Sequence, residues 1–515
     1  MDPIVTRTPC VSDVAQIKSQ AARVTGAKAR VRKWLAAIPI GPWRKTSSAS
    51  TPIRDARAAV EPEQDRVEDA CSSQAIRAQV LRLTWPVVIE QTLGMTVGLA
   101  NTYVVGHLGA APLATVGLCT QLSNLMIALF SGVGVGSTAL VARHVGAGER
   151  EEAERTAGQS LLLALAVGLI AAAPCLWWGH SLLTALGGDR NVVSLGQAYL
   201  QAAGTTMPLM AILFIGNAVL RGAGDTRTPM AVMGLVNLIN VSVSWSLVRG
   251  LGPFPALGVL GAGIGSAAGV GAGGLIVALI LLRGRSAAGF RVTPSALRFH
   301  RSRTRRILRI GVPAGGEQMV MRLAQLVMAF IVTQLGTTAY AGHQLGIQLL
   351  SAAFMPGFAF SVATTTLVGQ ELGRGAPRRA EACVYSACWM AVALMCSAGL
   401  GGFLLGRPLL QAFTSDAAVT AQGLYAVQGC ALIELPLAWY FVLAGALRGA
   451  GDTRFVLLTQ AVCIWLIRLP LAHRLALTFG LGLGGVWAAM ILDMAARAAM
   501  LALRFRKGAW KWLRV

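Results

Sequence analysis

Charged residues are what this sequence lacks most. Asp, Glu, Lys and Arg make up 13% of its 515 residues, and 55% are hydrophobic, whereas about a quarter of a soluble domain is charged. The mean hydropathy is +0.60. One very large core cannot absorb so much apolar surface, because soluble domains stop growing near about 250–300 residues. We therefore expect this surface to face lipid.

Acidic residues are scarcer than basic ones. There are 22 Asp and Glu against 45 Lys and Arg, which gives a net charge of +23. That number alone would suggest nucleic-acid binding. However, the basic residues lie in short runs between long apolar segments, as in the cytoplasmic loops of multi-span membrane proteins. We expect no nucleic-acid partner.

Patterns of metal or cofactor ligands are also missing. The nine cysteines are scattered without a CxxC pair, and the six histidines show no HExxH spacing. We expect no metal site and no cofactor, with the cysteines packing as small apolar residues. A GxGxxG-like pattern at 258–274 lies inside an apolar segment with no strand before it. Its glycines instead recur every four residues and predict close helix contact: Gly261, Gly265, Gly269 and Gly273.

The first 75 residues contain no apolar run of about 20 residues and cannot span a bilayer. We expect residues 1–78 to form a polar, basic and disordered cytosolic extension. Two alternatives are a helix that lies on anionic lipid and an organelle-targeting segment.

The rest of the chain is predicted to be an all-α integral membrane protein with about twelve spans. The expected spans are 84–106, 113–142, 157–179, 192–219, 229–248, 256–282, 307–334, 338–369, 382–405, 419–446, 456–474 and 482–503. An even number places both termini on one side. That side has 24 Lys and Arg in its connections and the other side has four, so the positive-inside rule predicts cytoplasmic termini in a cell membrane.

An octapeptide, LRGAGDTR, occurs at 220–227 and again at 447–454, an offset of 227 residues. The same offset pairs Glu90 with Glu317 and Pro86 with Pro313. Six spans per repeat give two parallel repeats. We expect a first lobe at 79–283, a basic cytoplasmic linker at 284–306, a second lobe at 307–504 and a basic cytoplasmic tail at 505–515.

The two octapeptides, called the signature loops below, are expected to be structural turns. Glycines permit a tight turn, the aspartates can cap the following helix, and the arginines favour the cytoplasmic surface. The residues concerned are Arg221, Gly222, Gly224 and Asp225 in the first loop, and Arg448, Gly449, Gly451 and Asp452 in the second.

These motifs resemble a known family. The segment 220–229 (LRGAGDTRTP) and its repetition, the segment 340–375 and the segment 105–118 (VGHLGAAPLATVGL) resemble the multidrug and toxic compound extrusion (MATE) family and its DinF-like branch. The resemblance implies two six-helix bundles and the export of small organic, often cationic or amphipathic, molecules in exchange for H⁺ or Na⁺. One position departs from the pattern, because Asn101 stands where many members have an aspartate, and an amide cannot be reversibly protonated.

A charged side chain within a span costs free energy of insertion, so each one indicates an interaction that offsets this cost. Glu90 and Glu317 are equivalent in the repeat and are either cation or substrate ligands or structural links at the inner end of their spans. Glu434 is a further candidate for a cation site in the second lobe, with Asn101 and Gln121 as neutral ligands. Two other intramembrane charges are expected to be structural, because Asp493 and Arg497 can pair at i,i+4. Arg468 can reach outward to the interface, and no role is assigned to it.

The leading hypothesis is a cation antiporter for small organic molecules that works by alternating access, is a monomer, contacts membrane lipid and is not an enzyme. One alternative is a flippase for lipid-linked sugars of the same superfamily, which would need a basic cleft for a pyrophosphate. The expected spans offer only Arg322, Arg468 and Arg497 for that purpose. A more remote alternative is a membrane-embedded transferase, for which the outer loops supply only Asp189 and Asp416 as acidic ligands.

Overall fold

The computed structural model describes residues 73–106, 108–250, 255–286, 289 and 291–513. The expected N-terminal extension lies outside this part of the chain up to residue 72. Its last residues, 73–78, already belong to the first described helix.

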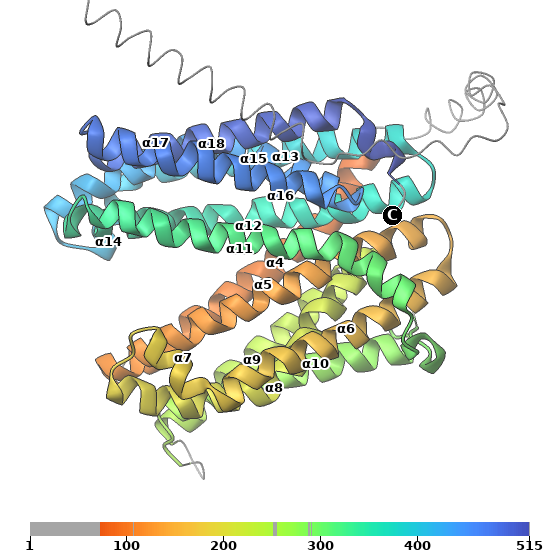
Figure 1. Cartoon of the computed structure of the whole chain (residues 1–515), viewed down its shortest axis with the longest axis horizontal. Coiled ribbons are helices and arrows are strands. Elements are labelled where there is room, and N and C mark those ends of the chain that lie inside the picture. Colours follow the sequence, from red (N-terminus) through yellow and green to blue (C-terminus); the bar gives the residue numbers. More distant parts are fainter. Residues whose placement is uncertain (1–72, 107, 251–254, 287–288, 290, 514–515) are drawn as a thin grey trace, which may run out of the picture. The chain divides into compact units, whose positions relative to one another are not determined.

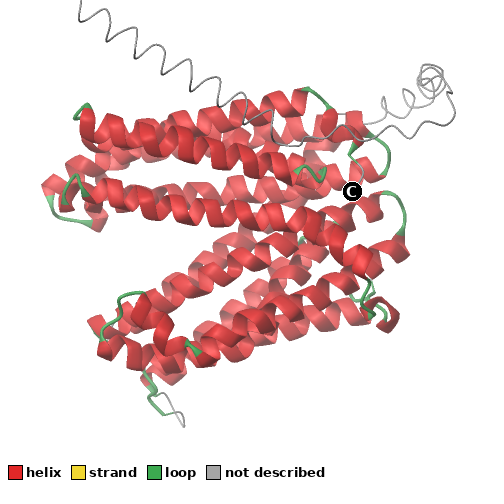
Figure 2. Cartoon of the chain, in the orientation of Figure 1, coloured by secondary structure: helices red, strands yellow, loops and turns green. Residues whose placement is uncertain are grey.

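The first repeat consists of six long helices and one short one. They are α4 (Ser73–Gly106), α5 (Ala110–Gly146), α6 (Arg150–Trp177), α7 (Gly179–Ala185), α8 (Arg190–Gly222), α9 (Arg227–Arg249) and α10 (Val259–Arg283). Apolar runs become helices in lipid because a helix satisfies its own backbone hydrogen bonds. Figure 2 shows only helices and loops in the described part of the chain.

The second repeat has the same order of helices. It contains α11 (Arg301–Thr333), α12 (Thr337–Gly373), α13 (Pro377–Leu404), α14 (Gly406–Phe413), α15 (Ala417–Gly449), α16 (Thr453–Val462), η2 (Cys463–Arg468), α17 (Leu469–His473), η3 (Arg474–Thr478) and α18 (Gly482–Arg506). The turns η2 and η3 are π-helical and divide one span into short pieces. Two 3₁₀ turns complete the structure: η1 (Pro294–Leu297) in the linker and η4 (Ala509–Trp512) in the tail.

The helices account for the twelve expected spans. Nine of those described are long and apolar enough to cross a membrane, and α12, which bends by 41°, is a tenth. The remaining two, α4 and α11, open the two repeats with 34 and 33 residues. The fold is therefore an all-α, twelve-span membrane fold in two parallel repeats (Figure 1).

The opening helix of each repeat packs partly against the other repeat. The start of α4 places Ile76, Val80 and Leu83 in the apolar core of the second repeat. Conversely, Ile307 and Ile310 at the start of α11 lie in a core of the first repeat. The two repeats are thus joined at one end by these exchanged helix segments.

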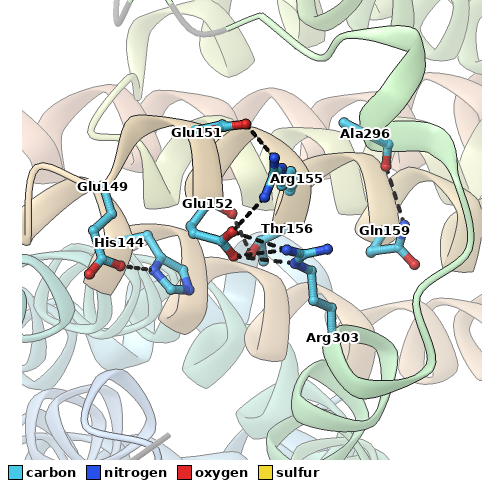
Figure 3. A network of polar contacts seen from close by, with 9 residues as sticks. All are labelled: His144, Glu149, Glu151, Glu152, Arg155, Thr156, Gln159, Ala296 and Arg303. Atoms are coloured by element: carbon cyan, nitrogen blue, oxygen red, sulfur yellow. Dashed lines mark hydrogen bonds and ion pairs between the residues drawn. The ribbon is translucent and has the colours of Figure 1, made fainter.

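The linker between the repeats is anchored to α6 (Figure 3). Glu152 binds Arg303 in a bidentate ion pair with N–O distances of 3.0 and 3.2 Å to Nη2. Gln159 donates to the backbone oxygens of Ala296 and Arg298, and its side-chain oxygen accepts from the His300 N–H at 2.9 Å. The polar end of α6 therefore fixes the path of the chain into α11.

The predicted glycine stripe does allow close helix contact. A Cβ added at Gly261, Gly265 or Gly269 would approach backbone atoms of α9 too closely for a real side chain. Close approach of this kind is how small residues let membrane helices associate. The prediction for this stripe is confirmed.

Candidate functional site

Two buried carboxylates pair with the arginines of the signature loops. Glu90 Oε1 lies 2.7 Å from Arg221 Nη1, and Glu317 Oε1 lies 2.5 Å from Arg448 Nη2. In both repeats the partners are 131 residues apart. Each pair ties the first helix of its repeat to the end of the fourth, at the end of the bundle that carries the signature loops, called the loop end below.

The pair in the second repeat has more partners. The Tyr440 hydroxyl contacts Glu317 Oε1 at 3.0 Å and Gln460 Oε1 at 2.7 Å, while Gln460 Nε2 donates to the Glu317 backbone oxygen at 2.6 Å. Arg448 Nη1 also donates to Ser361 Oγ at 3.1 Å. In contrast, Glu90 Oε2 is buried with no hydrogen-bond partner among the described residues.

Glu434 differs from both carboxylates because it has no pairing cation among the described residues. It is fully buried, and neither carboxyl oxygen has a hydrogen-bond partner in the described ranges. Its position is close to the middle of α15, since 434 − 417 = 17 residues precede it in the helix and 449 − 434 = 15 follow. Space for it comes from Gly399 on α13, where an added Cβ would lie 2.9 Å from Glu434 Cγ.

The two neutral candidates occupy different environments. Asn101 is buried on α4, and its Oδ1 lacks a partner within the described part of the chain. The same holds for Asn240 Oδ1 and Ser244 Oγ on the neighbouring helix α9. Gln121, however, is exposed on α5. The described spans of the first repeat thus have unpartnered oxygens on adjacent helices, and their buried carboxylate is Glu90, which pairs with Arg221.

Asp493, Arg497 and Arg468 form one cluster. Asp493 pairs with Arg497 at 2.5 Å as the i,i+4 spacing predicted. Arg468, for which an outward direction was considered, instead lies inside, since it is 8% exposed and its Nε lies 3.5 Å from Asp493 Oδ2. The π-helical turn η2 ends at Arg468 and lies against α18, which explains its inward direction.

The signature loops are tight turns, as predicted. Gly224 and Gly451 have φ of 91° and 89°, the left-handed region that favours glycine. Asp225 Oδ1 accepts the Thr228 N–H at 3.0 Å near the start of α9, so the capping prediction is confirmed there. It is wrong for Asp452, whose carboxylate instead lies 2.8 Å from Arg504 and makes no cap bond.

Helix α12 bonds the second repeat to the first signature loop. Thr366 Oγ1 donates to the Arg221 backbone oxygen at 3.1 Å, and Gln370 Nε2 donates to the Gly222 oxygen at 3.2 Å. Nearby, Gly146 and Gly373 leave room for the backbone of the opposite repeat. The contacts between repeats therefore gather at the loop end.

Sequence reasoning did not single out Tyr440, Gln460, Thr366 or Gln370. The repeat offers a signal for Tyr440 and Gln460. At the offset of 227, the corresponding residues of the first repeat are Leu213 and Met233, which are both apolar. A polar residue in a span whose duplicate is apolar indicates an interaction particular to one repeat.

Comparisons with known proteins agree with this architecture. The sequence model of the family described as MatE matches residues 86–246 and 313–473, two segments separated by the same offset of 227. A probable multidrug resistance protein NorM of Thermotoga maritima is 32% identical over 438 residues, covering 85% of this chain and 93% of that protein.

Solved structures share the fold. A crystal structure of a MATE protein in the straight conformation superposes with a TM-score of 0.79 at 23% identity, covering 85% of this chain and 97% of that one. The Vibrio cholerae MATE transporter VcmN in its bent form gives a TM-score of 0.77 at 20% identity, with coverage of 84% and 97%.

Proposed function

The chain belongs to the MatE family, and from this premise we propose that it is a secondary active transporter that exports small organic molecules in exchange for H⁺ or Na⁺. Its relative in Thermotoga maritima is named a probable multidrug resistance protein. Transport, rather than catalysis, is the activity of this family. We further propose a monomer in the plasma membrane with cytoplasmic termini, as the distribution of basic residues indicates.

The observation that carries this proposal is the isolation of Glu434. A carboxylate near the middle of a span, without a cation beside it, is expensive in a membrane. Both of its oxygens lack partners within the described ranges, so a proton or a sodium ion can take the place that an arginine occupies beside Glu317. We assign the coupling ion to Glu434.

Glu90 and Glu317 take a different role in this proposal. Each is held by an arginine of a signature loop at 2.7 or 2.5 Å, and breaking such a pair leaves an uncompensated buried charge. These two carboxylates hold the loop end of each repeat together. The unpartnered oxygens of Asn101, Asn240 and Ser244 are neutral and suit Na⁺ better than H⁺.

Alternating access requires at least two states in which different ends are closed. The contacts of Thr366 and Gln370 close the loop end in this structure. Because the signature loops lie on the side expected to be cytoplasmic, the state described here is closed toward the cytoplasm. An ion that binds the two states with different affinity shifts their populations.

The test is efflux of a fluorescent organic cation from everted membrane vesicles, first under an imposed proton gradient and then under a sodium gradient. We expect one gradient to drive transport in the wild type and Glu434→Gln to abolish it at normal expression. Met207→Gln is a matched control, because Met207 occupies the same position in the first repeat and is also buried. It should leave coupling intact.

Two results would contradict the proposal. If no dye moves under either gradient, drug antiport is wrong. If Glu434→Gln transports normally under the driving gradient, the coupling ion binds elsewhere, and the Asn101 region becomes the site to test.

A further inference from the structure

A cavity of about 360 Å³ lies between α14 and the start of α15. The two helices are held together by Leu410, which packs on Gly423, and by Gly406, which packs on Val427. Five of the eight lining residues are polar: Arg407 and Gln411 on α14, Thr414 and Ser415 in the connection, and Thr420 on α15. Helix α15 runs from here to the second signature loop, so the cavity lies at the opposite end of the bundle (Figure 1).

The cavity carries a single positive charge. Arg407 is the one charged side chain among the described residues that line it. The nearest acid along the chain is Asp416, and its Oδ1 accepts the backbone N–H groups of Ala418 at 2.8 Å and Val419 at 3.3 Å. This aspartate therefore caps α15 and does not line the cavity.

The lining offers several hydrogen-bond donors. The guanidinium group of Arg407 can only donate. Thr414 Oγ1 accepts the Asp416 N–H at 3.2 Å, which leaves its hydroxyl proton for a ligand. Thr420, by contrast, donates its hydroxyl proton to the Asp416 backbone oxygen at 2.9 Å. A cation beside hydroxyl and amide donors suits an anion with several acceptor oxygens, such as a phosphate group.

The first repeat forms the equivalent turn without these side chains. Asp189 stands 227 residues before Asp416 and also caps its helix, where it accepts the Val192 N–H at 2.8 Å, so the offset holds at this turn. At that offset the three hydroxyl residues of the cavity correspond to residues without a polar side chain: Gly187, Gly188 and Val193. The start of the helix therefore does not require the hydroxyl groups, and a role in binding is indicated for them.

Large apolar side chains around α14 are exposed. Leu404 is 70%, Leu405 57% and Phe413 60% exposed, and they flank Arg407 on both sides in the sequence. A short helix at the end of a span that combines such residues with a cation lies in the interface between headgroups and acyl chains. The cavity is therefore at the level of the lipid phosphates.

We propose that this cavity binds the headgroup of phosphatidylglycerol from the leaflet farther from the signature loops. The phosphate is the acceptor for Arg407 and for the hydroxyl groups of the connection, and the acyl chains lie along Leu404 and Phe413. One negative charge balances one guanidinium group. A zwitterionic headgroup is the poorer ligand, because the described lining residues offer its ammonium group no carboxylate.

The experiment measures which lipid surrounds α14 in a bilayer. The full-length protein, in a cysteine-free background, carries bimane on Leu404→Cys and is placed in phosphatidylcholine nanodiscs. A minor fraction of the lipid is brominated on its acyl chains, as either phosphatidylglycerol or phosphatidylcholine, because bromine quenches the fluorophore at short range. We expect phosphatidylglycerol to be enriched beside the label by about two- to tenfold, the effect of one hydrogen bond. Equal quenching by the two lipids would overturn the proposal.

A matched label gives the background. Trp177→Cys places bimane at the equivalent position of the first repeat, since 404 − 177 = 227, and Trp177 is likewise exposed. We expect no enrichment of phosphatidylglycerol there. Equal enrichment at both labels would show a general attraction of the lipid to a positive protein, and the assignment to this cavity would be wrong.

Variants of the lining residues locate the site. Arg407→Gln should remove the enrichment at Leu404→Cys, and Ser415→Gly, which installs the residue of the first repeat, should reduce it. Arg190→Gln is the matched control, because Arg190 is also exposed and begins the fourth long helix of the first repeat; it should leave the enrichment unchanged. Ser415→Gly keeps the proposal testable if Arg407→Gln does not fold. Enrichment that survives the lining variants would contradict the proposal.

Inorganic phosphate distinguishes a lipid from a soluble anion. It is added in excess over the brominated lipid, with chloride at equal ionic strength as the control, because salt screens surface charges. We expect the enrichment to persist. If phosphate removes it and chloride does not, the cavity binds a free anion and the lipid is the wrong ligand. No gradient or transported solute takes part, so a failure of the proposed antiport leaves this result unaffected.

Discussion

Three buried carboxylates in the spans of this chain differ in the number of their partners. Glu317 accepts three side-chain bonds, two from Arg448 and one from Tyr440. Glu90 accepts one from Arg221, and Glu434 accepts none within the described ranges. Removing a partner from a buried ion pair is strongly destabilising, whereas an unpaired acid remains available to an ion. The same residue type therefore serves stability in one place and binding in another.

We expect Glu317→Ala to destabilise the protein by about 3–5 kcal/mol, because the Arg448 guanidinium is left buried without its carboxylate. Glu90→Ala should cost less, since Glu90 has a single bond. The measurement is the midpoint of thermal unfolding in detergent.

The double variant Glu317→Ala/Arg448→Ala provides the control. Its loss should be smaller than the sum of the two single losses, because no unpaired charge remains. Additive losses would show that the two residues do not stabilise the protein as a pair.

At this scale the sequence predicted which residues matter better than it predicted their contacts. The spacing of Asp493 and Arg497 gave their pairing, since i,i+4 residues share a helix face. The Glu317–Arg448 pair joins different helices, and local spacing carries no information on such a contact. The outward direction considered for Arg468 was wrong, because a π-helical turn alters the face on which a residue lies.

Among helices, close packing depends on glycines that meet another backbone. In the second repeat, Gly445 on α15 faces the Ser361 oxygen of α12, and Gly449 faces the Thr365 oxygen. Thr365 Oγ1 donates to the Gly445 oxygen at 3.0 Å, and the equivalent Thr138 donates to the Ala218 oxygen at 2.8 Å. These crossings hold the fourth helix of each repeat against the second.

Gly445→Ala should lower the free energy of unfolding by about 1–3 kcal/mol, because the added Cβ would overlap the Ser361 oxygen and overpack the crossing. Gly401→Ala is the matched control on α13, where an added Cβ meets nothing within 4 Å. It should be neutral or should stabilise the helix by about 0.5–1 kcal/mol. Equal unfolding temperatures for the two variants would show that the crossing tolerates a methyl group.

The order of helices followed from the sequence because apolar runs of span length and a fixed repeat offset are local or periodic signals. The exchange of the first segments of α4 and α11 between repeats could not be predicted from the sequence, because the polar and basic residues of these segments resemble loop sequence. Whether Ile76 packs on its own repeat or on the other depends on shape complementarity between segments of the two repeats that are far apart in the sequence, which hydropathy does not encode.

At the scale of the whole molecule, contacts between the two repeats decide which end of the helix bundle is closed. In this structure α12 donates hydrogen bonds from Thr366 and Gln370 to backbone oxygens of the first signature loop. Both acceptors lie in the turn that Asp225 and Gly224 shape. The closed end is therefore held partly by bonds between repeats that transport must break.

Gln370→Ala should shift the population toward the state in which the loop end is open. A neutral hydrogen bond contributes about 0.5–1.5 kcal/mol, so the ratio of the two states should change by about two- to tenfold. The measurement is the distance between spin labels at Leu113→Cys and Phe330→Cys in a cysteine-free background. These exposed positions lie in different repeats, on α5 and α11, at the end opposite the signature loops.

Opening the loop end should bring these labels together, so the variant should enrich the shorter distances. Thr365→Val is the matched control, because Thr365 neighbours Thr366 but bonds Gly445 within its own repeat. It should leave the distance distribution unchanged. An unchanged distribution in Gln370→Ala, or an equal shift in Thr365→Val, would mean that the bonds to the signature loop do not set the balance between the two states.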